Sequence, residues 1–137
     1  MLNTDRSQSL RNALKANAIV AALSAVVLLI GDGLVAALLQ AYDALGRIHL
    51  AGVVLAIFAA FLFWLAGRDP VAPTLTRAAI GIDLLWVAGC AIAIGVGLTQ
   101  GQGTALVALC AAAFFVVAIA QLQGLKAAMA GGILIGR

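Results

Sequence analysis

Charged side chains are scarce in this sequence, and their scarcity excludes a soluble domain. Only 9% of the 137 residues are charged, whereas 65% are hydrophobic. A soluble domain has about 25% charged residues, which cover its core with a solvated surface. A helix that crosses a bilayer needs about 20 mostly apolar residues. The chain length therefore accommodates about four such helices and predicts one small membrane domain, residues 1–137, with no room for a soluble one.

Residues that bind metals or act as nucleophiles are also few. His49 is the single histidine, which excludes a bis-histidine haem site within one chain. A zinc site would need His49 with acids alone, which is an unusual ligand set. Cys90 and Cys110 lie deep in apolar runs at similar predicted depth. We expect two buried free thiols, and a disulfide or redox pair is the alternative. The sequence has no CxxC, nucleophile elbow, glycine-rich phosphate loop or HExxH motif. We therefore expect a protein that is not an enzyme and holds no metal.

The basic residues lie in the short segments that flank the apolar runs. In such positions they set orientation and contact anionic lipid headgroups, so the net charge of +3 does not indicate nucleic acid. The N-terminus, the second loop and the C-terminus together hold Arg6, Arg11, Lys15, Arg68, Arg77, Lys126 and Arg137. The first and third loops hold Arg47 alone. This asymmetry predicts a multi-pass protein of the bacterial inner membrane with both termini in the cytoplasm.

Four apolar runs alternate with polar, glycine-rich or proline-rich segments. They predict spans at about 14–30, 47–66, 78–98 and 105–125, and the short loops predict an antiparallel four-helix bundle. The segment 34–45 is predicted either as a short interfacial helix or as a continuation of the first span. Small residues four apart, such as Gly52 and Ala56 or Gly89 and Ala93, predict close contacts between helices. The first run is too long for a signal peptide, and no convincing cleavage site follows it.

A carboxylate interrupts the third predicted span. Asp83 lies six residues past Arg77, about 9 Å below the interface at a rise of 1.5 Å per residue. Asn17 and Gln121 lie at similar distances from the basic ends of the first and fourth spans. Trp86, three residues after Asp83, shares its helix face and can donate a hydrogen bond from its indole nitrogen.

Two interpretations of this intramembrane polar layer stay open. The first is a proton- or cation-responsive site, or a polar ligand pocket open to the cytoplasm, because acids inside spans are functional as a class. The second is a hydrogen-bonded knot that fixes the register of the helices, with Lys15 or Lys126 reaching toward Asp83.

A second polar group, the outer-side polar rim, is predicted at the opposite ends of the spans. Its members are Asp32, Asp43, Arg47 and His49. Asp43 and Arg47 are four residues apart and can pair on a helix surface. We interpret the group mainly as an interfacial rim of local ion pairs. A pH-sensing or proton-entry role for His49 with Asp32 is the alternative.

Three motifs resemble the DoxX-like families of small bacterial four-span membrane proteins. They are the basic LRNALKANA entry, Arg47-x-His49-x-x-Gly52, and Ile82-Asp83-x-x-Trp86. The resemblance implies a four-helix membrane bundle with largely unassigned biochemistry, in which some members are linked to quinone-dependent or redox complexes. No cofactor is predicted, and a bound lipid or quinone is the candidate ligand. The small multidrug exporters are similar in size, but they place their essential acid where this chain has Ser24.

The sequence therefore predicts a small integral membrane protein without catalysis of its own. We expect an accessory or structural subunit, or a homo-oligomeric bundle, whose partners are the lipid bilayer and other membrane subunits or copies of itself. The alternative is a carrier or channel for a small solute or protons in which Asp83 carries the charge change.

Overall fold

The computed structural model describes residues 2–131, and their side chains from residue 7 onward. This part of the chain forms α1 (Leu2–Ile30), α2 (Asp32–Leu39), the short 3-10 helix η1 (Tyr42–Ala44), α3 (Leu45–Ala66), α4 (Pro73–Gly95) and α5 (Gln102–Ala130). The prediction of an all-helical chain is confirmed for the described residues.

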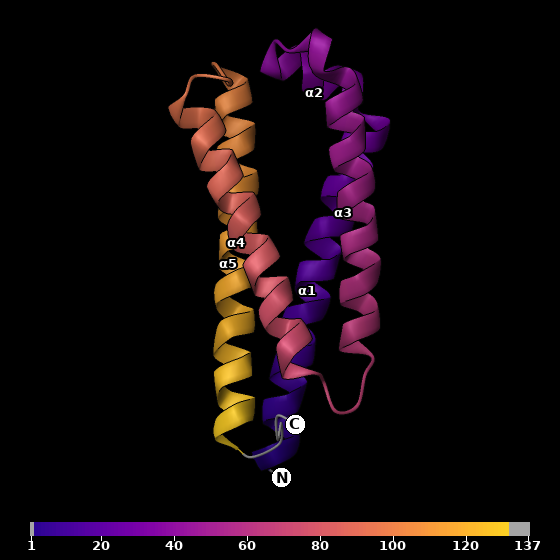
Figure 1. Ribbon diagram of the computed structural model, residues 1–137, viewed down its shortest axis with the longest axis vertical. Helices are drawn as coiled ribbons and strands as arrows, with labels where there is room; N and C mark the ends of the chain where they lie inside the picture. Colours follow the sequence, from indigo (N-terminus) through magenta and orange to yellow (C-terminus); the bar gives the residue numbers. More distant parts are fainter. Residues whose placement is uncertain (1, 132–137) are drawn as a thin grey trace.

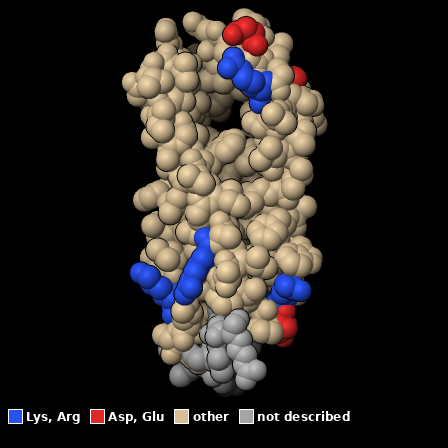
Figure 2. Space-filling view, in the orientation of Figure 1, with Lys and Arg blue, Asp and Glu red and all other residues tan. Residues whose placement is uncertain are grey.

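Within residues 2–131, four helical segments are long and apolar enough to cross a membrane, as predicted for a multi-pass membrane protein. They are Ser7–Ile30, Tyr42–Ala66, Pro73–Gly95 and Gln102–Ala130. Figure 2 shows that Lys, Arg, Asp and Glu gather toward the two ends of the molecule and leave a broad uncharged belt between them. An uncharged belt of this kind is typical of helices that cross a bilayer. Arg6 and Arg137, which contribute to the predicted topology, lie outside the described side chains.

The helix ends follow local backbone chemistry and differ from the expected spans by a few residues. α4 begins at Pro73, before the expected position 78, because proline is preorganised for the first helical position and Ala72 before it is extended. α4 ends at Gly95 before the expected position 98, and Gly97 follows with a φ of 73°. α5 begins at Gln102, directly after Gly101 with a φ of 54°. Glycine adopts such positive φ values without steric cost.

The segment after α1 is a separate short helix. Gly31 accepts the first hydrogen bond of α2 from the amide of Val35, and Gln40 ends α2 in the left-handed conformation. Residues 32–39 therefore form a short helix of their own, and the predicted interfacial position of the segment 34–45 stays a prediction.

The helices pack as two pairs, α1 with α3 and α4 with α5, and contacts between α1 and α5 join the pairs. α1 packs along α3 and α5, and α4 packs along α5, whereas α3 and α4 approach each other very little. Figure 1 shows α1 with α3 on one side, α4 with α5 on the other, and α2 beyond the end of α1. The start of α1, the end of α5 and the loop between α3 and α4 lie together at the lower end of that view.

Glycines permit the closest approaches of α1 to its neighbours. A Cβ atom on Gly52 of α3 would lie 2.8 Å from Leu29 Cγ, and one on Gly124 of α5 would lie 3.0 Å from Leu10 Cα. The predicted close contact at Gly89 is wrong. Gly89 is exposed, and a Cβ there would meet nothing within 4 Å, because this residue lies on the outward face of α4.

Candidate functional site

A fully buried polar group is built around Asp83. The inward face of α4 carries Thr76, Ala79, Ile80 and Asp83, which are its buried residues. This spacing of three and four residues places them on one side of the helix. The side chain of Asp83 therefore points into the bundle and is 0% exposed.

Two amides from different helices hold one oxygen of this carboxyl group. Asn17 Nδ2 of α1 donates to Asp83 Oδ2 over 2.6 Å, and Gln121 Nε2 of α5 donates to the same oxygen over 2.9 Å. Asn17 and Gln121 are also 0% exposed. The structure thus brings together three of the four residues placed in the predicted layer, from α1, α4 and α5. We call Asn17, Asp83 and Gln121 the Asp83 layer.

The Asp83 layer keeps unused hydrogen-bond capacity. Asp83 Oδ1, Asn17 Oδ1 and Gln121 Oε1 are buried acceptors without a partner. No ion pair of Asp83 with a lysine or arginine occurs among the described side chains, and both Lys15 and Lys126 are exposed. The predicted approach of these lysines to Asp83 is therefore absent from the described part of the chain. The carboxyl group depends on the two neutral amides.

Backbone packing joins α4 to α5, but the tie between α4 and α1 is made by side chains. α4 makes no close backbone approach to α1 within the described chain, whereas α1 packs closely along both α3 and α5. The Asn17–Asp83 hydrogen bond bridges this gap. Chemically, the layer is a clamp on three helices, and its three free acceptors suit a proton, a water molecule or a small cation.

Trp86 lies apart from the hydrogen bonds of the Asp83 layer. Its ring packs against Phe114 of α5, with the centroids 6.0 Å apart and an interplanar angle of 52°. Its Nε1 atom is buried and has no hydrogen-bond partner. The side chain instead forms part of the wall of a cavity farther along the bundle.

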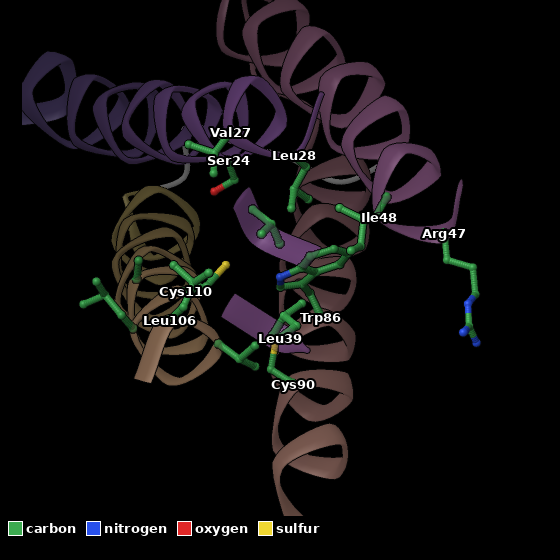
Figure 3. A pocket seen from close by; sticks show the side chains of 15 residues that line it. Ser24, Val27, Leu28, Leu39, Arg47, Ile48, Trp86, Cys90, Leu106 and Cys110 are labelled. Atoms are coloured by element: carbon green, nitrogen blue, oxygen red, sulfur yellow. The ribbon is translucent and has the colours of Figure 1, made fainter. Parts of the chain in front are cut away.

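This cavity has a volume of about 440 Å³ and lies where the two helix pairs separate. Its walls come from all four long helices, including Leu28, Ile48, Trp86 and Leu106, and α2 contributes Val35. In Figure 3 the lining side chains are almost all hydrocarbon, and the indole ring of Trp86 forms part of the wall.

The two cysteines also line the cavity. Cys90 of α4 and Cys110 of α5 are free and half-buried. Their positions agree with the expectation of two free thiols in apolar surroundings, and the alternative of a disulfide is not realised in this structure.

The members of the outer-side polar rim form two exposed pairs. Arg47 lies 3.6 Å from Asp43, with both side chains more than three-quarters exposed. His49 Nδ1 lies 3.5 Å from Asp32 Oδ2, and this pair is ionic only when the histidine is protonated. Exposed pairs of this kind contribute at most about 1 kcal/mol each. Only the aliphatic part of Arg47 reaches the cavity, since its guanidinium points away in Figure 3.

The opposite end of the molecule carries contacts that the sequence pattern did not indicate. Arg11 of α1 pairs with Asp69 of the α3–α4 loop over 2.8 Å. The guanidinium of Arg68 lies 4.4 Å above the ring of Trp64. The Arg68-Asp69-Pro70 sequence predicts the end of a helix, but it does not indicate that Asp69 pairs with Arg11 of α1. The cavity was also missed, because its lining is ordinary apolar sequence.

Among the side chains that the structure describes, no group of three His, Cys, Asp or Glu residues is placed to hold a metal ion. No family model, curated protein or solved structure matches this chain. The resemblance to the DoxX-like families therefore rests on its three motifs alone.

Proposed function

We propose that this chain is a non-enzymatic accessory or structural subunit of the bacterial inner membrane, which works by assembling with other membrane proteins or with its own copies. In this proposal the four spans form an antiparallel bundle with both termini in the cytoplasm, and the excess of basic residues at that end supports the orientation. Membership of the DoxX-like families is part of the same proposal and is supported by the motifs that contain Asn17, His49 and Asp83.

The observation that carries the proposal is the packing of α4. Its backbone packs closely only on α5 and makes a minor approach to α3, so most of its surface faces outward. On the outward face Leu85 is 73% exposed and Ile92 is 63% exposed, with Gly89 between them. A Cβ at Gly89 would meet nothing, so the backbone is open to a second helix. Small residues allow helices to approach closely in lipid, where packing contacts drive association.

The Asp83 layer supports the same proposal from inside the bundle. Its three side chains are fully enclosed, and none of them lines the cavity. A group that already binds two amides from neighbouring helices acts as a clamp on α4, and this clamp keeps the outward face of α4 in a fixed orientation.

The test is cross-linking in native membranes at native abundance. The background is Cys90→Ser with Cys110→Ser, and a single cysteine is introduced as Gly89→Cys or, as a matched lipid-facing control on α5, as Ala112→Cys. We expect oxidation to form a disulfide between two copies of the Gly89→Cys variant, or a bifunctional thiol reagent to link the variant to a defined partner that mass spectrometry identifies. Ala112→Cys should give neither product. If Gly89→Cys behaves like the control and the protein purifies as a monomer, assembly through α4 is rejected.

A second candidate is a carrier or channel for a small solute or protons that uses Asp83. It is favoured by the three unpaired acceptor oxygens around Asp83, which a proton or small cation would satisfy. In liposomes, this candidate predicts that Asp83→Asn abolishes transport while the protein stays folded. If the Asp83→Asn variant transports every tested solute as well as the unchanged protein does, the carrier or channel function is rejected.

A further inference from the structure

Two thiols face the same cavity from neighbouring helices. α4 and α5 lie side by side and run in opposite directions, which three contacts record: Arg77 with Met129, Asp83 with Gln121, and Trp86 with Phe114. Cys90 lies one helical turn after Trp86. Cys110 lies one turn before Phe114. Because residues four apart share a helix face, Cys90 and Cys110 form the next pair along this interface.

The cavity leaves both thiols within reach of a ligand. Cys90 and Cys110 are free and only half-buried, and both line the cavity of about 440 Å³. The two side chains are also close enough for their charges to interact. Figure 3 shows them at the wall of the cavity, one from each helix. The structure therefore presents two sulfur ligands to one space.

The number of ligands selects the kind of metal ion that can bind there. Within the side chains described for residues 7–131, no group of three His, Cys, Asp or Glu residues is placed to hold a metal ion. Structural zinc sites use four protein ligands and catalytic zinc sites use three. Two thiols alone suit a soft ion that binds two sulfur ligands in a line, such as Hg²⁺, Ag⁺ or Cu⁺.

The charge of the resulting complex narrows the choice further. Hydrocarbon side chains make most of the wall, and the guanidinium of Arg47 points away from the space. A net charge in such surroundings loses its hydration without compensation. One Hg²⁺ ion displaces a proton from each thiol to water and forms two S–Hg bonds, which gives a complex without net charge. A monovalent ion between two thiolates would leave one negative charge uncompensated.

We propose that Cys90 and Cys110 form a binding site for a soft, divalent, two-coordinate metal ion of the Hg²⁺ type, held as a neutral dithiolate that joins α4 to α5. The sequence predicts no metal because the known metal-binding motifs are absent from it. The two ligands of this site come from different helices, and such a pair leaves no motif of closely spaced residues. The site shares no residue with the Asp83 layer.

The experiment measures the binding of Hg²⁺ to the full chain in phosphatidylcholine nanodiscs, with 2-mercaptoethanol as a competing monothiol. The chain carries Trp64→Phe, so that its fluorescence reports Trp86, which lines the same cavity. We expect one ion per chain and quenching of Trp86 by the heavy ion. Two linked ligands bind about 10²–10⁴-fold more tightly than one, so Cys90→Ser and Cys110→Ser should each weaken binding by at least about a hundredfold.

A matched control keeps two thiols in the chain but changes the direction of one. In the chain with Cys110→Ser and Ala112→Cys, the second thiol moves two residues along α5 to an exposed position. Residues two apart on a helix do not face the same way. We expect this chain to bind Hg²⁺ no more tightly than Cys110→Ser alone. If the serine variant does not fold, Cys110→Ala with and without Ala112→Cys gives the same comparison.

The proposal is overturned if either single-cysteine chain or the control chain binds Hg²⁺ as tightly as the chain with both native cysteines, or if two ions bind per chain. It is also overturned if the bound ion leaves the fluorescence of Trp86 unchanged, because the ion then lies outside the cavity. The cross-linking test at Gly89 uses a chain without either native cysteine, so the metal site and the assembly function can fail separately.

Discussion

A double-mutant cycle on Asn17 and Asp83 tests whether the Asp83 layer clamps the helices. The perturbation is Asn17→Leu, which removes the amide that donates to Asp83 Oδ2 over 2.6 Å. Hydrogen bonds between membrane helices contribute about 0.6 kcal/mol on average and about 1.7 kcal/mol at most. This bond joins two fully buried side chains and leaves Asp83 with one donor instead of two, so the upper part of that range applies.

The expected changes in the free energy of unfolding depend on which groups lose their hydrogen-bond partners. We expect Asn17→Leu to lower the free energy of unfolding by about 1–2 kcal/mol when Asp83 is present. In the Asp83→Leu background the same change removes an amide that has lost its acceptor, so the loss should vanish or become a gain. The coupling energy is then about 1–2 kcal/mol. Reversible unfolding in mixed micelles, followed by the fluorescence of Trp86 in a Trp64→Phe chain, measures it.

Thr76 supplies the control for this cycle. It is as buried as Asp83 and lies on the same face of α4, but its hydroxyl donates to Ala72 O of its own helix, 3.0 Å away. Asn17→Leu and Thr76→Val should therefore be additive within about 0.5 kcal/mol. A coupling between Asn17 and Asp83 as small as this control would refute the clamp.

Two further predictions concern packing and the loop at the lower end of Figure 1. Gly103→Ala should destabilise the fold by about 1–3 kcal/mol, because its Cβ would lie 2.5 Å from the backbone oxygen of Leu38. Gly89→Ala, which meets open space in a helix interior, should be neutral or stabilising in unfolding titrations of the isolated protein, and equal losses at the two sites would contradict the packing described. Asp69→Asn should cost less than about 1 kcal/mol, since Asp69 is 87% exposed in its pair with Arg11; a loss above about 2 kcal/mol would show that the loop is held more firmly than an exposed ion pair allows.

The coarse fold can be predicted from the order of residues along the chain alone. The apolar length of each run determines whether a helix can cross a bilayer, and proline and glycine determine where it stops. The depth of Asn17, Asp83 and Gln121 follows in the same way, because the rise per residue converts a distance in sequence into a depth. Their hydrogen bonds also require that all three helices turn these residues toward one point, which is a property of packing.

The sequence does not determine which way a residue faces around the axis of its helix. Gly52 and Gly89 occur in similar patterns of small residues, yet one lies against α1 and the other faces outward. Trp86 shares a helix face with Asp83, but the one-turn offset carries its indole past the layer to Phe114 and the cavity. The cavity exists because α3 and α4 diverge, and no residue in either helix signals that divergence.

The mass of the species extracted from native membranes at native abundance tests the proposed assembly most directly. One chain has a mass of 13.8 kDa. In gentle detergent, the proposal predicts one defined species heavier than a single chain with its bound lipid, which Gly89→Leu dissociates and Ala112→Leu leaves intact. A homogeneous monomer of 13.8 kDa, unchanged by either substitution, would contradict it.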